Sequence, residues 1–172
     1  MKNIDFYINK LEQSIKNPNQ GLPEEVFLFI SRLTPLINVD LLVKDENNRT
    51  LLAWRNDEYY GDGWHIPGGI VRFQETIENR IKKVAEIEIG TIVEFNRTPL
   101  KLTEFISNTK NRSHGISLLY SCFLTRNYVP ENKGFKKTDQ GYLKWHETCP
   151  KKLLKIQEIY RDYINGDYHG KL

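Results

Sequence analysis

Residues 63–90, GWHIPGGIVRFQETIENRIKKVAEIEIG, combine two adjacent glycines with a helical segment that ends at a third glycine. Adjacent glycines let the main chain approach a ligand closely. A helix that begins just beyond them presents free N–H groups and the positive end of its dipole, which favour a phosphate group. Carboxylates on that helix add the oxygen ligands that Mg²⁺ prefers. The combination is typical of a site that handles a diphosphate together with a divalent cation.

Glu88 is the carboxylate of this stretch that most strongly indicates a ligand. It lies four residues after Val84 and three after Ala85, so it continues the apolar stripe of a helix expected over residues 75–89. An acid beside Gly90 is also unfavourable to the C-terminal end of the helix dipole. An inward acid that destabilises its own helix indicates a bound cation, and the alternative is an ordinary solvated helix acid. Glu75 begins the helix, where an acid is favoured in any case.

The elements that position these residues follow from periodicity and from breakers. Helices are expected at about residues 5–16, 23–33, 75–89 and 150–164, the central one ending at Gly90. Strands are expected at 36–43 and 50–55, paired as a hairpin, and extended segments at 64–67, 92–105, 116–125 and 141–145. A turn is expected at Gly68 and Gly69. Strands before and after a central helix, without regular βαβ alternation, predict an α+β sandwich.

Composition limits the class of protein. A chain of 172 residues is one domain by size, and 39% hydrophobic with 27% charged residues is typical of a globular protein. No apolar run approaches the ~18 residues of a membrane crossing, and the N-terminus does not resemble a secretory signal, so we expect a cytoplasmic protein without a membrane partner. The net charge of +3, with no dense basic cluster, argues against nucleic acid as a partner and is compatible with a small anionic ligand.

The 63–90 stretch resembles the signature of the Nudix hydrolase family: a glycine, five residues, a glutamate, seven residues, then Arg-Glu-U-x-Glu-Glu-x-Gly-U, where U is a bulky aliphatic residue. Four signature positions match, namely Gly69, Glu75, Glu88 and Gly90. The departures include Lys83, Val84, Ile87 and Thr91. The resemblance implies a Nudix-type α/β/α sandwich with a mixed sheet and a central catalytic helix. We expect an N-terminal helical extension at 1–22 and the hydrolase domain at 23–172.

The pattern of lost acids is similar to that of the GDP-mannose mannosyl hydrolase branch of this family, and LTPLINVDLLV and LLAWR upstream also resemble that branch. In the branch, water attacks the anomeric carbon of the sugar and GDP leaves. The resemblance therefore implies a Mg²⁺-dependent hydrolase of a nucleoside diphosphate sugar, with Mn²⁺ as the alternative ion and a homodimer as the common default. A conventional pyrophosphohydrolase and a non-catalytic nucleotide-binding module are the competing functions.

The resemblance also implies roles for matching positions. Glu88 and a backbone carbonyl of Gly68 or Gly69 would bind the metal, with Glu75 as a weaker candidate. Arg55 would contact the diphosphate and Lys83 would support it as it leaves. Asp40, on the polar face of its strand beside Asn38, would lie in the same region.

Two departures from the branch affect the site. Ile70 stands where the branch has an arginine, so we expect Arg72 to supply that phosphate contact. The branch also has a Gln-His pair, metal ligand and general base, before a late tryptophan, and Asp139 and Gln140 of TDQGYLKW occupy those places. Asp139 is therefore the candidate ligand or base, with His114 as a weaker alternative base. Gln140 cannot accept a proton and is expected to contact the substrate.

Overall fold

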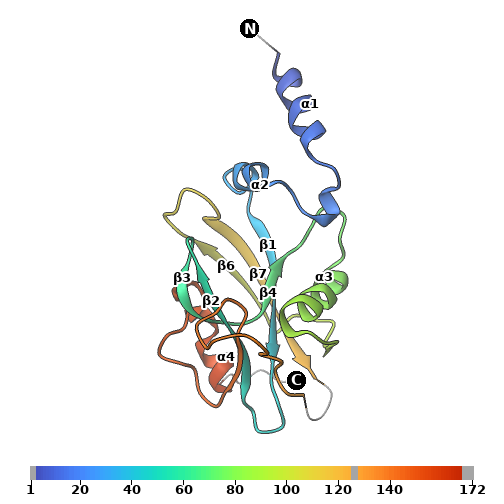
Figure 1. The fold of residues 1–172 in the computed structure, drawn as a ribbon. Helices are drawn as coiled ribbons and strands as arrows, with labels where there is room; N and C mark the ends of the chain where they lie inside the picture. Colours follow the sequence, from blue (N-terminus) through green and yellow to red (C-terminus); the bar gives the residue numbers. More distant parts are fainter. Residues whose placement is uncertain (1–2, 125–127, 168–172) are drawn as a thin grey trace.

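Strand β1, Leu36–Val43, is the apolar run LINVDLLV, and it lies in the middle of the larger of two sheets (Figure 1). The computed structural model describes residues 3–124 and 128–167. In it β1 pairs antiparallel with β4, Gly68–Ile70, and parallel with β7, His114–Phe123. Strands β5, Glu94–Phe95, and β6, Lys101–Ile106, both pair antiparallel with β7. The sequence predicts that the strand corresponding to β7 ends at Thr125, which lies outside the described residues.

The smaller sheet consists of three antiparallel strands in the order β3-β2-β8. These are β2, Thr50–Asp57, β3, Gly61–His65, and β8, Leu143–His146. The predicted hairpin between β1 and β2 is wrong, because the two strands share only the isolated bridge Lys44–Thr50. Strand β1 pairs with β7 along its whole length and with β4 at three residues, whereas β2 pairs with β3 and β8.

The central helix behaves as expected from its pattern. Helix α3, Ile77–Val84, begins after the N-cap Thr76 and continues into one π-helical turn, η2, Ala85–Ile89. It ends at Gly90, whose φ of 77° lies in the left-handed region. Single π-helical turns inside helices are frequent at functional sites, and Glu88 lies on this one.

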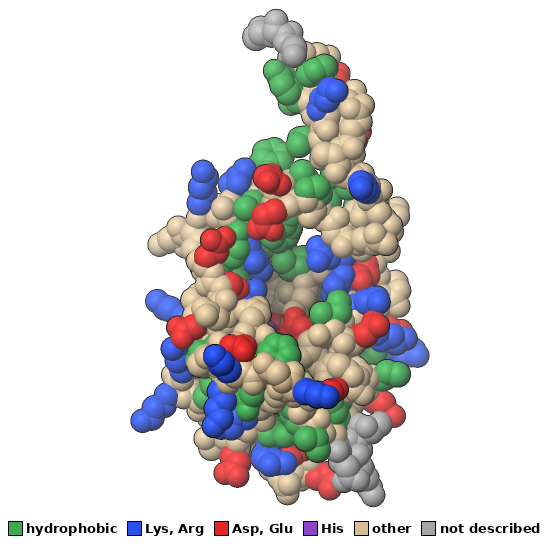
Figure 2. Space-filling view, viewed as in Figure 1, with side chains coloured by type: hydrophobic (Ala, Val, Ile, Leu, Met, Phe, Trp, Pro, Cys, Tyr) green, Lys and Arg blue, Asp and Glu red, His purple; other side chains and the backbone are tan. Residues whose placement is uncertain are grey.

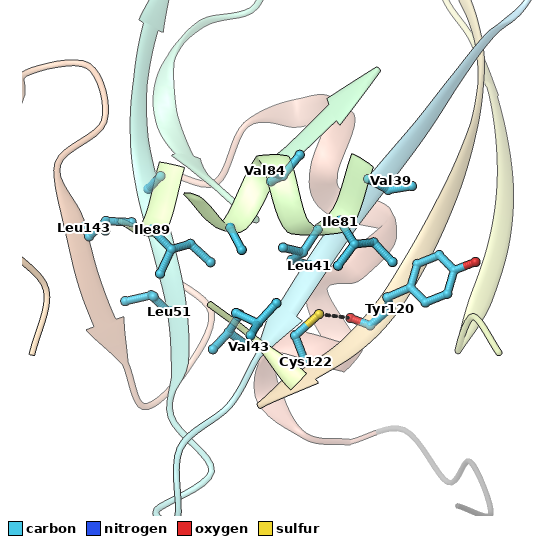
Figure 3. Close-up of a cluster of buried hydrophobic side chains, with 13 residues drawn as sticks. Val39, Leu41, Val43, Leu51, Ile81, Val84, Ile89, Tyr120, Cys122 and Leu143 are labelled. Atoms are coloured by element: carbon cyan, nitrogen blue, oxygen red, sulfur yellow. Dashed lines mark hydrogen bonds between the residues drawn. The ribbon is translucent and has the colours of Figure 1, made fainter. Parts of the chain in front are cut away.

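The apolar core fixes which way this helix faces. Figure 3 shows Val39, Leu41 and Val43 of β1 meeting Ile81, Val84 and Ile89 of the helix, with Leu51 and Leu143 from the smaller sheet. A second cluster lies on the opposite face of β1 and β7 and includes Leu42, Leu119, Tyr160 and Ile164. The last two come from the C-terminal helices, so helices cover both faces of the larger sheet. The predicted α+β sandwich with a mixed sheet is confirmed.

Two local predictions need correction. Gly68 and Gly69 form strand β4 rather than a turn, because they pair with Asp40 and Val39 of β1. The helix expected at 150–164 is a 3₁₀ helix, η3, Lys155–Tyr160, followed by α4, Arg161–Asn165. The residues before it are held at the smaller sheet instead, where Leu153 forms a bridge with Trp64.

The N-terminal segment projects away from the sheets (Figure 1). Helix α1, Ile4–Ser14, has no buried residue, and it is followed by a short 3₁₀ turn, η1, Pro18–Gln20, and by helix α2, Glu24–Ile30. Apolar side chains of α1, including Ile4, Ile8 and Leu11, are exposed. Within residues 3–124 and 128–167, no helix combines the length and apolar character needed to cross a bilayer.

Candidate functional site

A cavity of about 1090 Å³ opens beside η2 and strand β4. Figure 2 shows a hollow in the middle of this face with basic side chains around it. The cavity is lined by six of the residues that the sequence predicted for the site: Arg55, Gly68, Gly69, Arg72, Glu88 and Gln140. These residues come from segments up to 85 positions apart, so the fold brings together most of the predicted site.

Glu88 is a desolvated carboxylate at this cavity. Its Oε2 accepts a hydrogen bond from the backbone N–H of Gly68 at 3.3 Å. Burial raises the pKa of Glu88 to about 7; the Gly68 N–H and the Arg55 charge oppose this rise, and the Asp40 charge adds to it. Among the described residues, no lysine or arginine forms an ion pair with Glu88. A carboxylate that lacks a cationic partner and faces a cavity fits a bound cation.

Asp40 of β1 is the pairing partner of Gly68. It is buried and accepts hydrogen bonds from the Ser117 hydroxyl, from the Tyr160 hydroxyl at 2.9 Å and from the Asn38 amide at 2.8 Å. Burial raises its pKa to about 6, and these three hydrogen bonds oppose the rise. Its network borders a smaller cavity of about 80 Å³, which shares Arg55 and Gly68 with the large one.

The residues present fit one divalent ion better than a cluster of ions. Among the described residues, no group of three or more His, Cys, Asp or Glu side chains is arranged to hold a metal. A cation at Glu88 would therefore need backbone carbonyl, water and ligand oxygens, all of which Mg²⁺ accepts.

Both arginines that were predicted to contact an anion line the large cavity. Arg55 donates from Nε to the Asp57 carboxylate, its guanidinium lies 5.1 Å from the centre of the Tyr60 ring, and it lines both cavities. Arg72 lines the large cavity and lies against Gly21, and burial lowers its pKa. Both guanidinium groups are placed to meet an anion in the cavity.

Three predicted residues are not brought to either cavity. Lys83 is exposed and pairs with Glu86 at 2.8 Å. Glu75 accepts the Arg72 N–H and pairs with Arg80 at 2.6 Å, so it stabilises the helix start. Asp139 accepts the Lys136 N–H at 2.8 Å and closes a turn. The alternative base His114 lies on strand β7, where it bonds to Glu104 at 2.9 Å.

Asp139→Asn is expected to change kcat and KM less than about twofold, because the carboxylate is engaged in its own turn and an amide oxygen can accept the same bond. Steady-state kinetics of the variant check this. A drop in kcat of a hundredfold or more would instead restore the role that the sequence assigned to Asp139.

His65 is a site residue that sequence reasoning missed. It is buried, it lines both cavities, and its Nδ1 lies 2.9 Å from the Ile66 carbonyl oxygen. Burial, with a smaller effect of the Arg55 charge, lowers its pKa to about 4, so the ring is neutral at pH 7. In a neutral ring Nδ1 donates to the carbonyl, and the lone pair is then on Nε2. The sequence feature that could have identified His65 is its position in a short strand next to the glycine pair.

Arg112 is the second missed residue. It lies between β6 and β7, 40 or more positions from the other two arginines that line the cavities, and it lines both cavities. Nothing in the sequence around it, NRSHG, marks it as a ligand-binding residue.

Solved structures with similar architecture were found, and no family model matches the chain. A MutT protein of Methanosarcina mazei superposes with a TM-score of 0.57 at 17% identity, covering 77% of this chain and 93% of that one. A possible asymmetric diadenosine tetraphosphate hydrolase of Jonesia denitrificans gives 0.57 at 17% identity, covering 81% and 99%. A NUDIX hydrolase of Nitrosomonas europaea gives 0.58 at 16% identity, covering 80% and 74%. The chain therefore has a Nudix-type fold.

A curated relative matches part of the sequence. The low-salt glycan biosynthesis protein Agl8 of Haloferax volcanii is 33% identical over 76 residues, which are 44% of this chain and 48% of that protein. The match thus spans about half the length of the curated relative.

Proposed function

We propose that the protein is a Mg²⁺-dependent Nudix-type hydrolase that releases a nucleoside diphosphate from a GDP-mannose-like nucleotide sugar by water attack at the anomeric carbon. The observation that carries the proposal is the Glu88 carboxylate, desolvated and without a cationic side-chain partner among the described residues, beside a cavity that also holds Arg55 and Arg72. The Agl8 relative is named for glycan biosynthesis, which supports a sugar-containing substrate.

In this proposal Glu88 and a backbone carbonyl of Gly68 or Gly69 hold the ion, with Mn²⁺ as the alternative metal. The bound ion would stabilise the charge that develops on the departing diphosphate. Arg55 and Arg72 orient the diphosphate through charge-assisted hydrogen bonds. Gln140, whose side-chain oxygen accepts the Asn56 N–H at 2.9 Å, lines the cavity as a substrate contact.

We assign the removal of the water proton to His65 in place of Asp139. As the water oxygen bonds to the anomeric carbon, the bond from that carbon to the diphosphate oxygen breaks and the proton passes to Nε2 of His65. The position of the ring supports this role, because it lines both cavities and its Nδ1 bond to the Ile66 carbonyl leaves the lone pair on Nε2.

His65→Gln is expected to lower kcat by about 10²-fold with KM little changed, since general base catalysis contributes ~10²–10⁴-fold. His114→Gln is the matched control, because that ring lies on the surface beside Glu104 and should leave kcat unchanged. Equal kcat values for the His65 variant and the wild type would remove His65 from the mechanism.

The reaction is tested by incubating the protein with GDP-mannose and Mg²⁺ in ¹⁸O-water. The proposal predicts label in the free sugar. Label in a phosphate product would mean conventional pyrophosphate cleavage, the second candidate; the J. denitrificans neighbour is named as a possible hydrolase of diadenosine tetraphosphate. No turnover across a panel of nucleotide sugars and nucleotides would leave a binding module.

We further propose a cytoplasmic location, a division into an extension at 1–22 and a hydrolase domain at 23–172, and a homodimer. The exposed apolar side chains of α1 support the extension and the dimer. Light scattering of the full chain and of a chain that begins at residue 23 tests the homodimer and the separate nature of the extension.

A further inference from the structure

We propose that Arg112 is a third diphosphate-binding arginine of the cavity, beside Arg55 and Arg72, and helps to replace the phosphate contact that Ile70 cannot make. The inference rests on the proposed function for its ligand, a nucleoside diphosphate, but it is carried by the geometry of Arg112 itself.

Aromatic side chains fix the position of the Arg112 guanidinium. Its central carbon lies 5.6 Å from the ring centre of Phe27, 5.3 Å from that of Tyr59 and 5.1 Å from that of Tyr60. Planar contacts of this kind hold a guanidinium by cation–π attraction without neutralising its charge. The group therefore remains a full positive charge that is already oriented.

Arg112 lacks the partners that its neighbours have. Arg55 pairs with Asp57 and Arg80 with Glu75, whereas Arg112 forms no ion pair with any carboxylate of the described residues. Within the described part of the chain, its Nε is buried and has no hydrogen-bond partner. A buried N–H without a partner destabilises the protein, and an anionic ligand would remove that cost by accepting its hydrogen.

The backbone at Arg112 is held in an unfavourable conformation. Its φ is 55°, in the left-handed region that residues other than glycine rarely adopt. The Arg112 N–H donates to the hydroxyl of buried Ser31 at 3.1 Å, which ties the β6–β7 loop to the end of α2. Strain of this kind persists where the surrounding structure requires one particular placement.

This conformation places Arg112 close to Arg55, the arginine proposed to bind the diphosphate. Arg55 and Arg112 both lie 5.1 Å from the centre of the Tyr60 ring, so their guanidinium groups are within about 10 Å of each other. Both line the two cavities, as does Ile70. A diphosphate in the cavity could thus be bound by Arg55 and Arg112 together, with Arg72 as a further lining residue of the large cavity.

The test is the affinity for GDP and for guanosine, measured by calorimetry with Mg²⁺ present. Arg112→Gln is expected to weaken GDP binding by about 10- to 100-fold, since hydrogen bonds between charged groups contribute ~1.5–3 kcal/mol. Guanosine, which lacks phosphate, should bind the variant and the wild type equally. Arg32→Gln is the matched control, because Arg32 also lies over an aromatic ring, that of Phe29 at 5.6 Å, but does not line either cavity.

Unchanged GDP affinity in Arg112→Gln, or an equal loss for GDP and guanosine, would overturn the inference. If that variant does not fold, the Nε–Hε resonance of Arg112 in the wild type decides the question. It should shift on addition of GDP and not of guanosine, and Arg112→Lys identifies the peak. A protein that binds GDP through Arg112 but turns over no substrate would refute the proposed hydrolase and leave this inference intact.

Discussion

Glu88→Gln is expected to lower kcat by about 10²–10³-fold and, at the same time, to stabilise the ligand-free protein. The loss follows from the proposed role as metal ligand, because a bound ion stabilises transition-state charge by several kcal/mol and each 1.36 kcal/mol is a factor of ten. The gain follows from burial, which raises the pKa of this carboxyl from 4.5 to about 7. Loss of activity with a gain of stability is the signature of a functional, destabilising acid.

The stability effect has a definite pH dependence. Since ionisation of Glu88 is disfavoured in the folded state, the folded protein binds more protons than the unfolded chain between about pH 4.5 and 7. Its contribution to stability therefore falls as the pH rises through that window. Without metal, Glu88→Gln should match the wild type near pH 4.5 and exceed it by about 2–3 kcal/mol at pH 8.

Urea unfolding of both proteins at several pH values, without divalent ions, measures this difference. Glu86→Gln is the matched control, since Glu86 is exposed, pairs with Lys83 and should change stability by less than about 0.5 kcal/mol at either pH. A Glu88→Gln protein that is less stable than the wild type at pH 8 would contradict the assignment of Glu88 as a desolvated acid that lacks its cation.

Gly68→Ala is expected to destabilise the fold by about 3 kcal/mol or more. A Cβ at this position would collide with the Asp40 carboxylate and lie 2.8 Å from the Val39 carbonyl oxygen. Neither neighbour can move cheaply, because Asp40 is held by three hydrogen bonds and Val39 lies in β1 between two paired strands. Forcing an extra methyl group into such packing costs ~1–3 kcal/mol, and the displaced carboxylate adds to that.

Gly69→Ala provides the comparison. Its Cβ would lie 2.8 Å from Cγ2 of Val84, a side chain that can shift with the helix, so we expect a cost of only about 1–2 kcal/mol. Thermal unfolding of the two variants should therefore rank Gly68→Ala well below Gly69→Ala. Equal melting temperatures would mean that the Asp40–Gly68 contact does not constrain the site.

Local patterns in the sequence predicted two of the elements around the site, strand β1 and the central helix. Strand β1 has the predicted bounds, and the stripe that ends at Gly90 identified both the helix and the inward position of Glu88. The β1–β2 hairpin failed because strand pairing depends on contacts distant in sequence. Here β1 pairs instead with the parallel neighbour β7 and with the short strand β4.

The residues that were misplaced or missed depend on tertiary structure. Lys83 occupies the signature position of an arginine, yet Arg80, three residues earlier, makes the ion pair with Glu75. Asp139 was aligned by counting along a loop, whose turn directs the carboxylate to Lys136. Arg112 becomes part of the site only because α2 and the turn at Tyr59 and Tyr60 converge on it.

The binding of Mn²⁺, followed by electron paramagnetic resonance in the presence of GDP, decides whether Glu88 holds the metal ion, because Mn²⁺ takes the same oxygen ligands as Mg²⁺. We expect the wild type to bind one ion per chain in a GDP-dependent manner, and Glu88→Gln to lose that site while Glu86→Gln keeps it. Equal Mn²⁺ binding by the wild type and by Glu88→Gln would show that Glu88 is not the metal ligand.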